Sequence, residues 1–296
     1  MIRPKLLLIG GSNIDFIGTS KAKLISSVSN IGEVNISFGG VMRNITENLA
    51  RLGNDLTFIT AIGNDNFGNK IIENLKSLNV KIIYPKTNLP TSTYLAINDF
   101  NHDLAYGICD NRIINELSIT YLKSLKSLIN QFDHLILDTN LNEETIIYLL
   151  ETYKDKKIFI DTISPTKALK VKNHLKYIYL LKCNIYEAKS LINKEETDNY
   201  KIVKELLNIG AKNIVLTSGS NNIYYGNEKG IDIVNIKKIE KFENTTGCGD
   251  ALMSGLIDSL ITGYSLKDSI IFGDKLSKLT LMSKSATTIE IEKYRH

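Results

Sequence analysis

The stretch Asn244–Asp250 combines residue types that can hold an anion and remove a proton beside it. Gly247 and Gly249 flank the small residue Cys248, so backbone N–H groups can turn toward one point without obstruction by a Cβ atom. An apolar helix is predicted to begin at Asp250, and its N-terminus would direct free N–H groups at the same point. A carboxylate there is poorly placed to hold phosphate but well placed to accept a proton from a hydroxyl that attacks phosphate. The stretch therefore indicates phosphoryl transfer from a nucleotide to an alcohol, although Gly-x-Gly-Asp could also simply cap a helix.

A second glycine motif lies near the other end of the chain. Gly39-Gly40 precedes Asn44 and the helical pattern Ile45–Leu52, which Gly53 is expected to terminate. Paired glycines let a backbone approach a ligand closely, and an asparagine can both donate to and accept from sugar hydroxyls. A tight turn with a local cap is the simpler alternative for this motif.

The elements that must position these motifs alternate along the chain. Short apolar runs predict strands buried on both faces, and helical patterns intervene, which is typical of a mostly parallel sheet covered by helices on both sides. The predicted strands are Leu6–Ile9, Leu56–Ala61, Leu135–Leu137, Lys157–Ile160, Ile178–Leu181 and Ile214–Leu216, and the predicted helices are Asn66–Leu78, Glu143–Tyr153, Tyr186–Ile192 and Tyr200–Ile209.

Two segments interrupt this alternation. Residues 14–38 contain no useful helical pattern and carry Val34, Ile36 and Phe38 at strand period. Residues 93–108 are predicted to form a hairpin around the polar turn Asn98–Asp103. Without a covering helix, these strands must bury one face elsewhere, or they extend the main sheet in an antiparallel sense.

The two glycine motifs together resemble the signatures of the ribokinase-like (PfkB) carbohydrate kinases, and the likeness runs from Ile9–Asp15 to the C-terminal helices. The resemblance implies an α/β fold, namely a single three-layer α/β/α kinase domain over residues 1–296 with a mostly parallel central sheet. It also implies a small β lid over the sugar site, with strands within about 14–38 and 92–110. In this family the lid is often paired with the same lid of a second subunit, so a homodimer is expected.

Within the family, the resemblance is strongest to members that phosphorylate the nucleoside pseudouridine. It is carried by Ser29–Gly32 and by Gly39–Ala50, with weaker support from Thr91–Leu95 and Asp138–Leu141. The implied reaction is transfer of the γ-phosphoryl group of ATP to the 5′-hydroxyl of the ribose. The alternative acceptor is another ribonucleoside or a free sugar, such as adenosine or ribose, because Asp15 and Asn44 would recognise hydroxyls rather than a base.

The resemblance also implies roles for individual residues. Asp250 would be the general base, and the backbone of Gly247, Cys248 and Gly249 would stabilise charge on the transferred group. Asn13, Asp15, Gly39, Gly40, Asn44 and Thr93 would bind the substrate, and a carboxylate such as Asp15 can accept two vicinal hydroxyls. Asn184, Thr217 and Gly219, with Gly247 and Gly249, would contact ATP. Glu187 would hold Mg²⁺ through water, but Asn184 and Glu187 are also ordinary capping residues.

Two departures from the family pattern affect these expectations. Cys248 places a thiol at a helix N-terminus, an environment that can lower its pKa and make it reactive, so alkylation that ATP prevents is expected. Asn244 stands where many members carry Asp, and a neutral amide holds a monovalent cation such as K⁺ less strongly than a carboxylate does.

Composition bounds the remaining possibilities. The 296 residues carry a formal net charge of +4, and the lysines are dispersed rather than clustered, so no nucleic-acid groove is indicated. Three cysteines and four histidines show neither a disulfide framework nor metal-ligand spacing. We expect a cytoplasmic protein without a signal peptide, membrane segment or membrane partner, acting on a small molecule.

Two further alternatives come from other functional classes. Gly10-Gly11-Ser12-Asn13 after the first strand could indicate a dinucleotide site, but the three-glycine spacing and the acidic residue of that motif are missing. A non-catalytic sugar-binding relative is also conceivable, and the intact Asp250 argues against it. Neither alternative predicts turnover of ATP.

Overall fold

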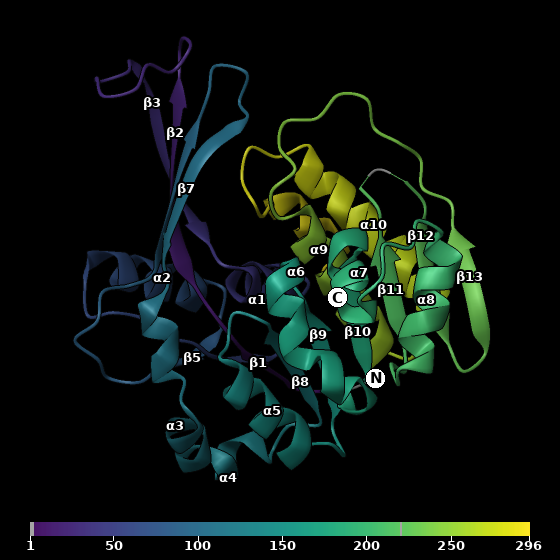
Figure 1. The fold of residues 1–296 in the computed structure, drawn as a ribbon. Coiled ribbons are helices and arrows are strands. Elements are labelled where there is room, and N and C mark those ends of the chain that lie inside the picture. The colour runs from purple at the N-terminus through teal and green to yellow at the C-terminus, as the bar shows by residue number, and fades with distance from the viewer. Residues whose placement is uncertain (1–2, 220) are drawn as a thin grey trace.

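The computed structural model describes residues 3–219 and 221–296, and its strands form two separate sheets (Figure 1). The larger sheet has nine strands in the order β13-β12-β11-β10-β9-β8-β1-β4-β5. Their bounds are β1 Leu6–Ile9, β4 Leu56–Ile59, β5 Lys81–Ile83, β8 His134–Asp138, β9 Lys157–Asp161, β10 Leu180–Asn184, β11 Ile214–Thr217, β12 Ile223–Asn227 and β13 Gly230–Val234.

Helices cover both faces of this main sheet. They are α1 Val41–Arg51, α2 Asn66–Ser77, α3 Ile119–Ser124, α4 Lys126–Ile129, α5 Glu143–Thr152, α6 Pro165–Ala168, α7 Ile185–Ile192, α8 Asn199–Asn208, α9 Cys248–Ile261 and α10 Leu266–Leu281, with 3₁₀ turns η1 Arg112–Glu116, η2 Leu169–Tyr177 and η3 Ile289–Tyr294. Within the described ranges, none of the helices has the length and apolar character needed to span a lipid bilayer.

Strand residues divide alternately between two cores. Leu7 and Ile9 of β1 pack with helices α5, α7 and α8, whereas Leu6 and Leu8 pack with α1, α9 and α10. Because both faces are buried, an uninterrupted apolar run is the sequence that a central parallel strand requires. The pairings among β5, β4, β1, β8, β9, β10 and β11 are parallel, which confirms the predicted α/β class with a mostly parallel central sheet.

Three local differences from the predicted elements have physical reasons. The strand expected from Ile178 begins at Leu180, after the turn that ends η2. The helix expected from Asp250 begins at Cys248, because Gly247 takes the left-handed conformation (φ 82°) that ends the preceding loop. An antiparallel hairpin, β12–β13, extends one edge of the main sheet and was not predicted.

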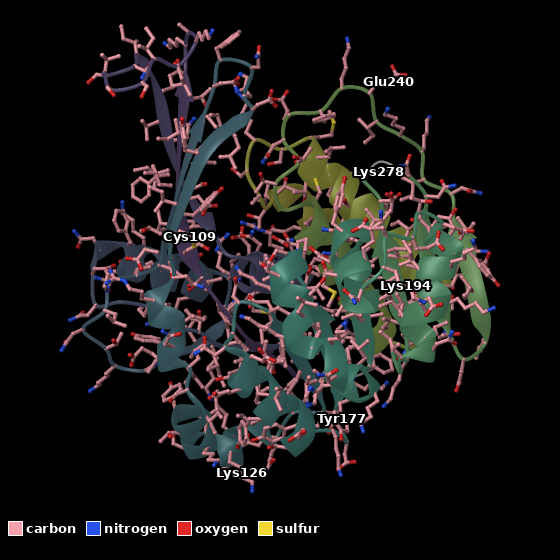
Figure 2. All side chains as sticks on the ribbon, in the orientation of Figure 1. Cys109, Lys126, Tyr177, Lys194, Glu240 and Lys278 are labelled. Atoms are coloured by element: carbon pink, nitrogen blue, oxygen red, sulfur yellow. The ribbon has the colours of Figure 1, made fainter. Side chains whose placement is uncertain are left out.

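The four-stranded small sheet projects from the main body (Figure 1). It contains β3 Gly32–Gly39, β2 Asn13–Ser20, β6 Thr93–Asn98 and β7 Leu104–Asp110, in that order. Its strands arise from both segments that interrupted the α/β pattern, and they form a sheet of their own rather than an extension of the main one. Figure 2 labels Cys109, on β7 of this sheet.

The two faces of the small sheet differ in chemistry. The register aligns Ile36, Phe16, Leu95 and Ile108 in one row and Val34, Gly18, Ile97 and Tyr106 in the next, all on one face. We call this the outer face. Its exposed apolar side chains are Val34, Ile36, Leu95, Ile97, Tyr106 and Ile108. Asp15, Tyr94 and Cys109 are aligned in register on the opposite, inner face.

Candidate active site

Three charged residues form a row at the carboxyl ends of adjacent strands in the main sheet. Asp138 ends β8, Asp161 ends β9 and Lys182 lies near the end of β10, and the register pairs each directly with the next. They lie on the same face as Ile136, Phe159 and Leu180, the face covered by α1 and α9. The Nζ atom of Lys182 donates to Oδ2 of Asp161 at 2.6 Å. The row therefore places buried charge beneath the N-termini of α1 and α9.

Asp250, in the first turn of α9, is buried above this row. Nδ2 of Asn44, on α1, donates to its Oδ2 at 2.8 Å. Burial and the charge of Asp161 raise the pKa of Asp250 to about 7, although Lys182 and the Asn44 hydrogen bond act in the opposite direction. A carboxylate with a pKa near neutrality is suited to accept a proton from a hydroxyl.

Gly247 and Gly249 leave room at the start of α9 where a side chain would not fit. A Cβ atom on Gly247 would overlap the carbonyl oxygen of Ala286, and one on Gly249 would lie 3.0 Å from Nζ of Lys182. The N–H groups of Gly249 and Asp250 donate to no acceptor among the described residues. The helix N-terminus can therefore bind an anion beside the carboxylate.

The predicted substrate residues meet where the small sheet joins the main body. Asn13 and Gly39 are paired across β2 and β3, and the Asn13 amide donates to the Asp15 carboxylate. A Cβ atom on Gly39 would overlap that carboxylate, and one on Gly40 (φ 97°) would lie 2.9 Å from the carbonyl oxygen of Gly11. The glycine pair thus allows a close approach between two strands and the start of α1.

Asp15 is partly shielded from solvent in this junction. Burial raises its pKa to about 6, against the hydrogen bond from Asn13 and the charge of Arg43. Gly39, Gly40, Asn13 and Asp15 lie together at this junction. Asn44 joins them to Asp250, because its amide is hydrogen-bonded to the predicted base.

Thr93 takes a different position from the other predicted substrate residues. It lies in register with Leu95 and Ile97 on the outer face, and it lines a cavity of about 480 Å³ together with Asp65, Phe67 and Thr91. The residue that shares the inner face with Asp15 is its strand partner Tyr94.

The predicted nucleotide and metal residues lie around β10 and β11. Asn184 caps α7 in a reciprocal capping box with Glu187, and Asn184 is paired with Thr217. Glu187 is buried and accepts hydrogen bonds from the Thr162 hydroxyl (2.7 Å) and from the backbone N–H and side-chain amide of Asn184. Gly219 takes a positive φ of 59° in the exposed turn that follows Thr217.

The residues around Glu187 fit a Mg²⁺ ion that is bound mainly by the phosphates of a nucleotide and only indirectly by the protein. In the described part of the chain, no group of three or more His, Cys, Asp or Glu side chains is arranged to hold a metal. Both carboxylate oxygens of Glu187 already accept bonds from the protein. Mg²⁺ in kinases keeps several waters and binds chiefly to substrate phosphates, so contact through water is compatible with these residues.

The expected lowering of the Cys248 pKa is wrong. Burial raises the pKa of its thiol to about 11, so the neutral form predominates at neutral pH despite the helix N-terminus. Desolvation at this half-buried position and the nearby charge of Asp250 both disfavour the thiolate, against the hydrogen bond with Ser277.

Sequence reasoning missed Asp161 and Lys182. A signal was present, because each stands at the end of an apolar run, as Asp138 does. Polar residues at the carboxyl ends of parallel strands meet at one edge of the sheet, where ligands bind in open α/β folds.

Comparison with known proteins identifies the class. The profile of the pfkB family carbohydrate kinases matches residues 3–293, and the chain belongs to this family. Pseudouridine kinase from Escherichia coli (strain K12) is 30% identical over 283 residues, which cover 93% of this chain and 90% of that protein. The predicted kinase family is therefore confirmed, and the dinucleotide-binding alternative is wrong.

Two solved structures share the fold. Ribokinase from Thermotoga maritima superposes with a TM-score of 0.86 at 21% identity and covers 98% of both chains. Ribokinase from Cryptococcus neoformans var. grubii serotype A in complex with ADP gives a TM-score of 0.78 at 17% identity, with 99% of both chains covered. The ribokinase-like α/β fold is thus confirmed.

Proposed function

We propose that this protein transfers the γ-phosphoryl group of ATP to the 5′-hydroxyl of pseudouridine and forms pseudouridine 5′-phosphate. The observation that carries the proposal is the buried Asp250 carboxylate at the free N-terminus of α9, joined to Asn44 of the Gly39-Gly40 motif. Similarity to the Escherichia coli pseudouridine kinase supports the choice of acceptor within the family.

In this mechanism Asp250 accepts the proton of the attacking hydroxyl as its oxygen bonds to phosphorus. Asn44 orients the carboxylate through its amide hydrogen bond. The backbone N–H groups of Gly247, Gly249 and Asp250 stabilise the negative charge of the transferred group. The Cys248 N–H, also expected to contribute, donates to the carbonyl oxygen of Thr245 at 3.4 Å and would have to leave it to do so. The protein thereby contributes orientation and electrostatic stabilisation, which is most of what phosphoryl transfer requires.

Ribose recognition is assigned to the junction of the small sheet and α1. Asp15 accepts hydrogen bonds from two ribose hydroxyls, Asn13 holds that carboxylate in place, and Gly39-Gly40 lets the sugar approach the backbone. Thr93 is retained as a substrate residue only through the backbone of β6, since it aligns with the outer face.

ATP would lie along Asn184, Thr217 and Gly219, with its phosphates toward Gly247 and Gly249. The ADP complex of the Cryptococcus ribokinase supports an adenine nucleotide as the phosphoryl donor in this fold. Mg²⁺ would neutralise charge on the phosphates, held through water by Glu187. Activation by K⁺ is expected to be weak, because Asn244 offers a neutral amide rather than a carboxylate.

The small sheet would act as a lid whose outer face pairs with that of a second copy, so the protein would be a homodimer. Six large side chains are exposed on that face: Val34, Ile36, Leu95, Ile97, Tyr106 and Ile108. A contiguous apolar surface of this kind is typical of a protein–protein interface.

The deciding experiment measures ATP consumption with Mg²⁺ against pseudouridine, uridine, adenosine and ribose, with Asp250→Asn as the control. A strong preference for pseudouridine, lost in the variant, is expected. Preference for another acceptor would overturn the substrate and leave the kinase chemistry. No turnover with any acceptor would favour a non-catalytic binding protein.

A further inference from the structure

The reaction above uses none of the three charges in the row beneath Asp250, and Lys182 is the one cation among them. Lys182 is 8% exposed, and its Nζ atom is held by Asp161 at 2.6 Å. Burying an ammonium is costly unless it is paired, and Asp161 provides the pair. The same atom is close to the start of α9, since a Cβ atom on Gly249 would lie 3.0 Å from it.

The surroundings of Asp250 are otherwise acidic. The charged groups that face it are Asp161 from β9, Asp138 from β8 and Lys182 from β10, and α1 contributes the uncharged Asn44. Helix α10 packs against α9 further along, where Gly273 meets Gly255. Lys182 is therefore the cation that opposes two neighbouring carboxylates at the proposed base.

The surroundings of Lys182 and Asp138 determine how much charge each group carries beside Asp250. Burial opposes the ammonium of Lys182, but Asp161 and Asp250 raise its pKa, so it stays charged at neutral pH. Burial raises the pKa of Asp138 to about 6, so that part of its charge is lost near that pH. Removing Lys182 would leave Asp250 facing carboxylates alone, in a site of low dielectric where charges interact strongly.

We infer that Lys182 is a positioning residue for the base: clamped by Asp161, it holds Asp250 as the carboxylate that accepts the proton. Asp161 serves two opposing functions, since it repels Asp250 and fixes the cation that attracts it. This inference rests on the proposed function only where it predicts a change in turnover. The electrostatic coupling between Lys182 and Asp250 needs no substrate.

The coupling can be measured without substrate. The protein labelled with ¹³C at aspartate carboxyl groups is titrated by NMR, and the Asp250 signal is identified by its loss in Asp250→Asn. We expect Lys182→Met to move the titration midpoint of Asp250 upward by about one pH unit, a tenfold change in the ionised fraction. Asp161→Asn should move it downward, because one repelling charge is lost and Lys182 remains.

Lys170→Met is the matched control. Lys170 is half-buried at the same edge of the sheet, but its Nζ atom donates to the carbonyl oxygens of Thr139 and Leu141. The Asp250 midpoint should not change in this variant. Lys182→Gln replaces Lys182→Met if the methionine variant does not fold, and the same upward shift is expected.

Turnover provides the second measurement. The acidic limb of the pH profile of kcat/KM should move with the NMR midpoint in each variant. An unchanged Asp250 midpoint, or shifts of the same sign in the Lys182 and Asp161 variants, would overturn the inference. Weaker ATP binding at an unchanged midpoint would make Lys182 a nucleotide contact instead. If wild type turns over no acceptor, the proposed function fails, and the NMR titration still decides the coupling.

Discussion

The carboxyl edge of the main sheet and the small sheet contribute to the same candidate site in opposite ways. At the main-sheet edge, Asp138, Asp161 and Lys182 are buried and paired across adjacent strands, and Asp250 of α9 is buried beside them. In the small sheet, most apolar side chains of the outer face are exposed, and the residues proposed to bind the substrate lie at its base. Charges interact strongly at the buried edge of the main sheet, because the dielectric constant is low and the side chains are fixed. The small sheet is packed on fewer sides, so we expect it to move more easily around a ligand.

The largest predicted effect comes from the buried region. Asp250→Asn should lower kcat by about 10²–10³-fold or more, since it removes the base while keeping a side chain that can bond Asn44. The variant should also be more stable than wild type above pH 7. The pKa of Asp250 is raised from 3.8 to about 7, so its favourable contribution is present below pH 3.8 and is lost as the pH rises through 7.

Activity assays and thermal melts at pH 4 and pH 8 test both parts. The gain in Tm of Asp250→Asn should be largest at pH 8, at roughly 2–4 °C for each kcal/mol, and should vanish near pH 4. If Asp250→Asn melts below wild type at pH 8, the carboxylate stabilises the fold rather than destabilising it. The main-sheet edge would then not differ from the small sheet in the way described above.

A smaller effect is expected at the base of the small sheet. Gly39→Ala should lower kcat/KM for the acceptor by about 10–100-fold, because the added Cβ atom overlaps the Asp15 carboxylate and displaces its hydrogen bonds. Gly18→Ala is the control in the same sheet, since its Cβ atom would come no closer than 3.9 Å to another residue. Equal losses in the two variants would mean that the sheet is simply intolerant of alanine.

The outer face provides the next test. Ile108→Glu should convert the proposed homodimer to monomer in sedimentation experiments and raise KM by about tenfold or less, because a buried charge would disrupt an apolar interface. Ile271→Glu, on α10, replaces an isoleucine that is also exposed and should change neither property. A wild-type monomer at working concentration would contradict the pairing of lids.

The smallest effect concerns the thiols. Iodoacetamide at pH 7 should modify the exposed Cys109 before Cys248 or the buried Cys183, and ATP should not alter the rate at Cys248. Mass spectrometry of the peptides gives the order. Rapid, ATP-protected loss of the Cys248 thiol would show that the helix N-terminus, rather than burial, controls this edge of the main sheet.

The sequence predicts local patterns well because buried strands and helix ends have local signatures. Leu6–Ile9 is predicted with its observed bounds, and α2, α5, α7 and α8 are each found within a residue or so of prediction. The two glycine motifs could be recognised in the sequence for the same reason, because each forms a close backbone approach within a few residues that a side chain would block.

Features that depend on pairing between distant strands could not be predicted. The charged row needs the register of β8, β9 and β10, which no single segment encodes. The position of Thr93 on the outer face depends on its pairing with Ile14. The pKa of the Cys248 thiol could not be predicted from its place at a helix end, because it depends mainly on how deeply the folded chain buries the sulfur.

The hydrogen bond between Asn44 and Asp250 also has a meaning for how the chain folds. Its partners lie 206 residues apart in sequence, and the loop between them includes most of the main sheet. Contacts of such separation form late, because the closure entropy of the intervening chain must first be overcome. In a chain emerging from the ribosome, the proposed base Asp250 does not lie beside Asn44 until α9 docks on α1. Recovery of activity during refolding would therefore report completion of the whole fold.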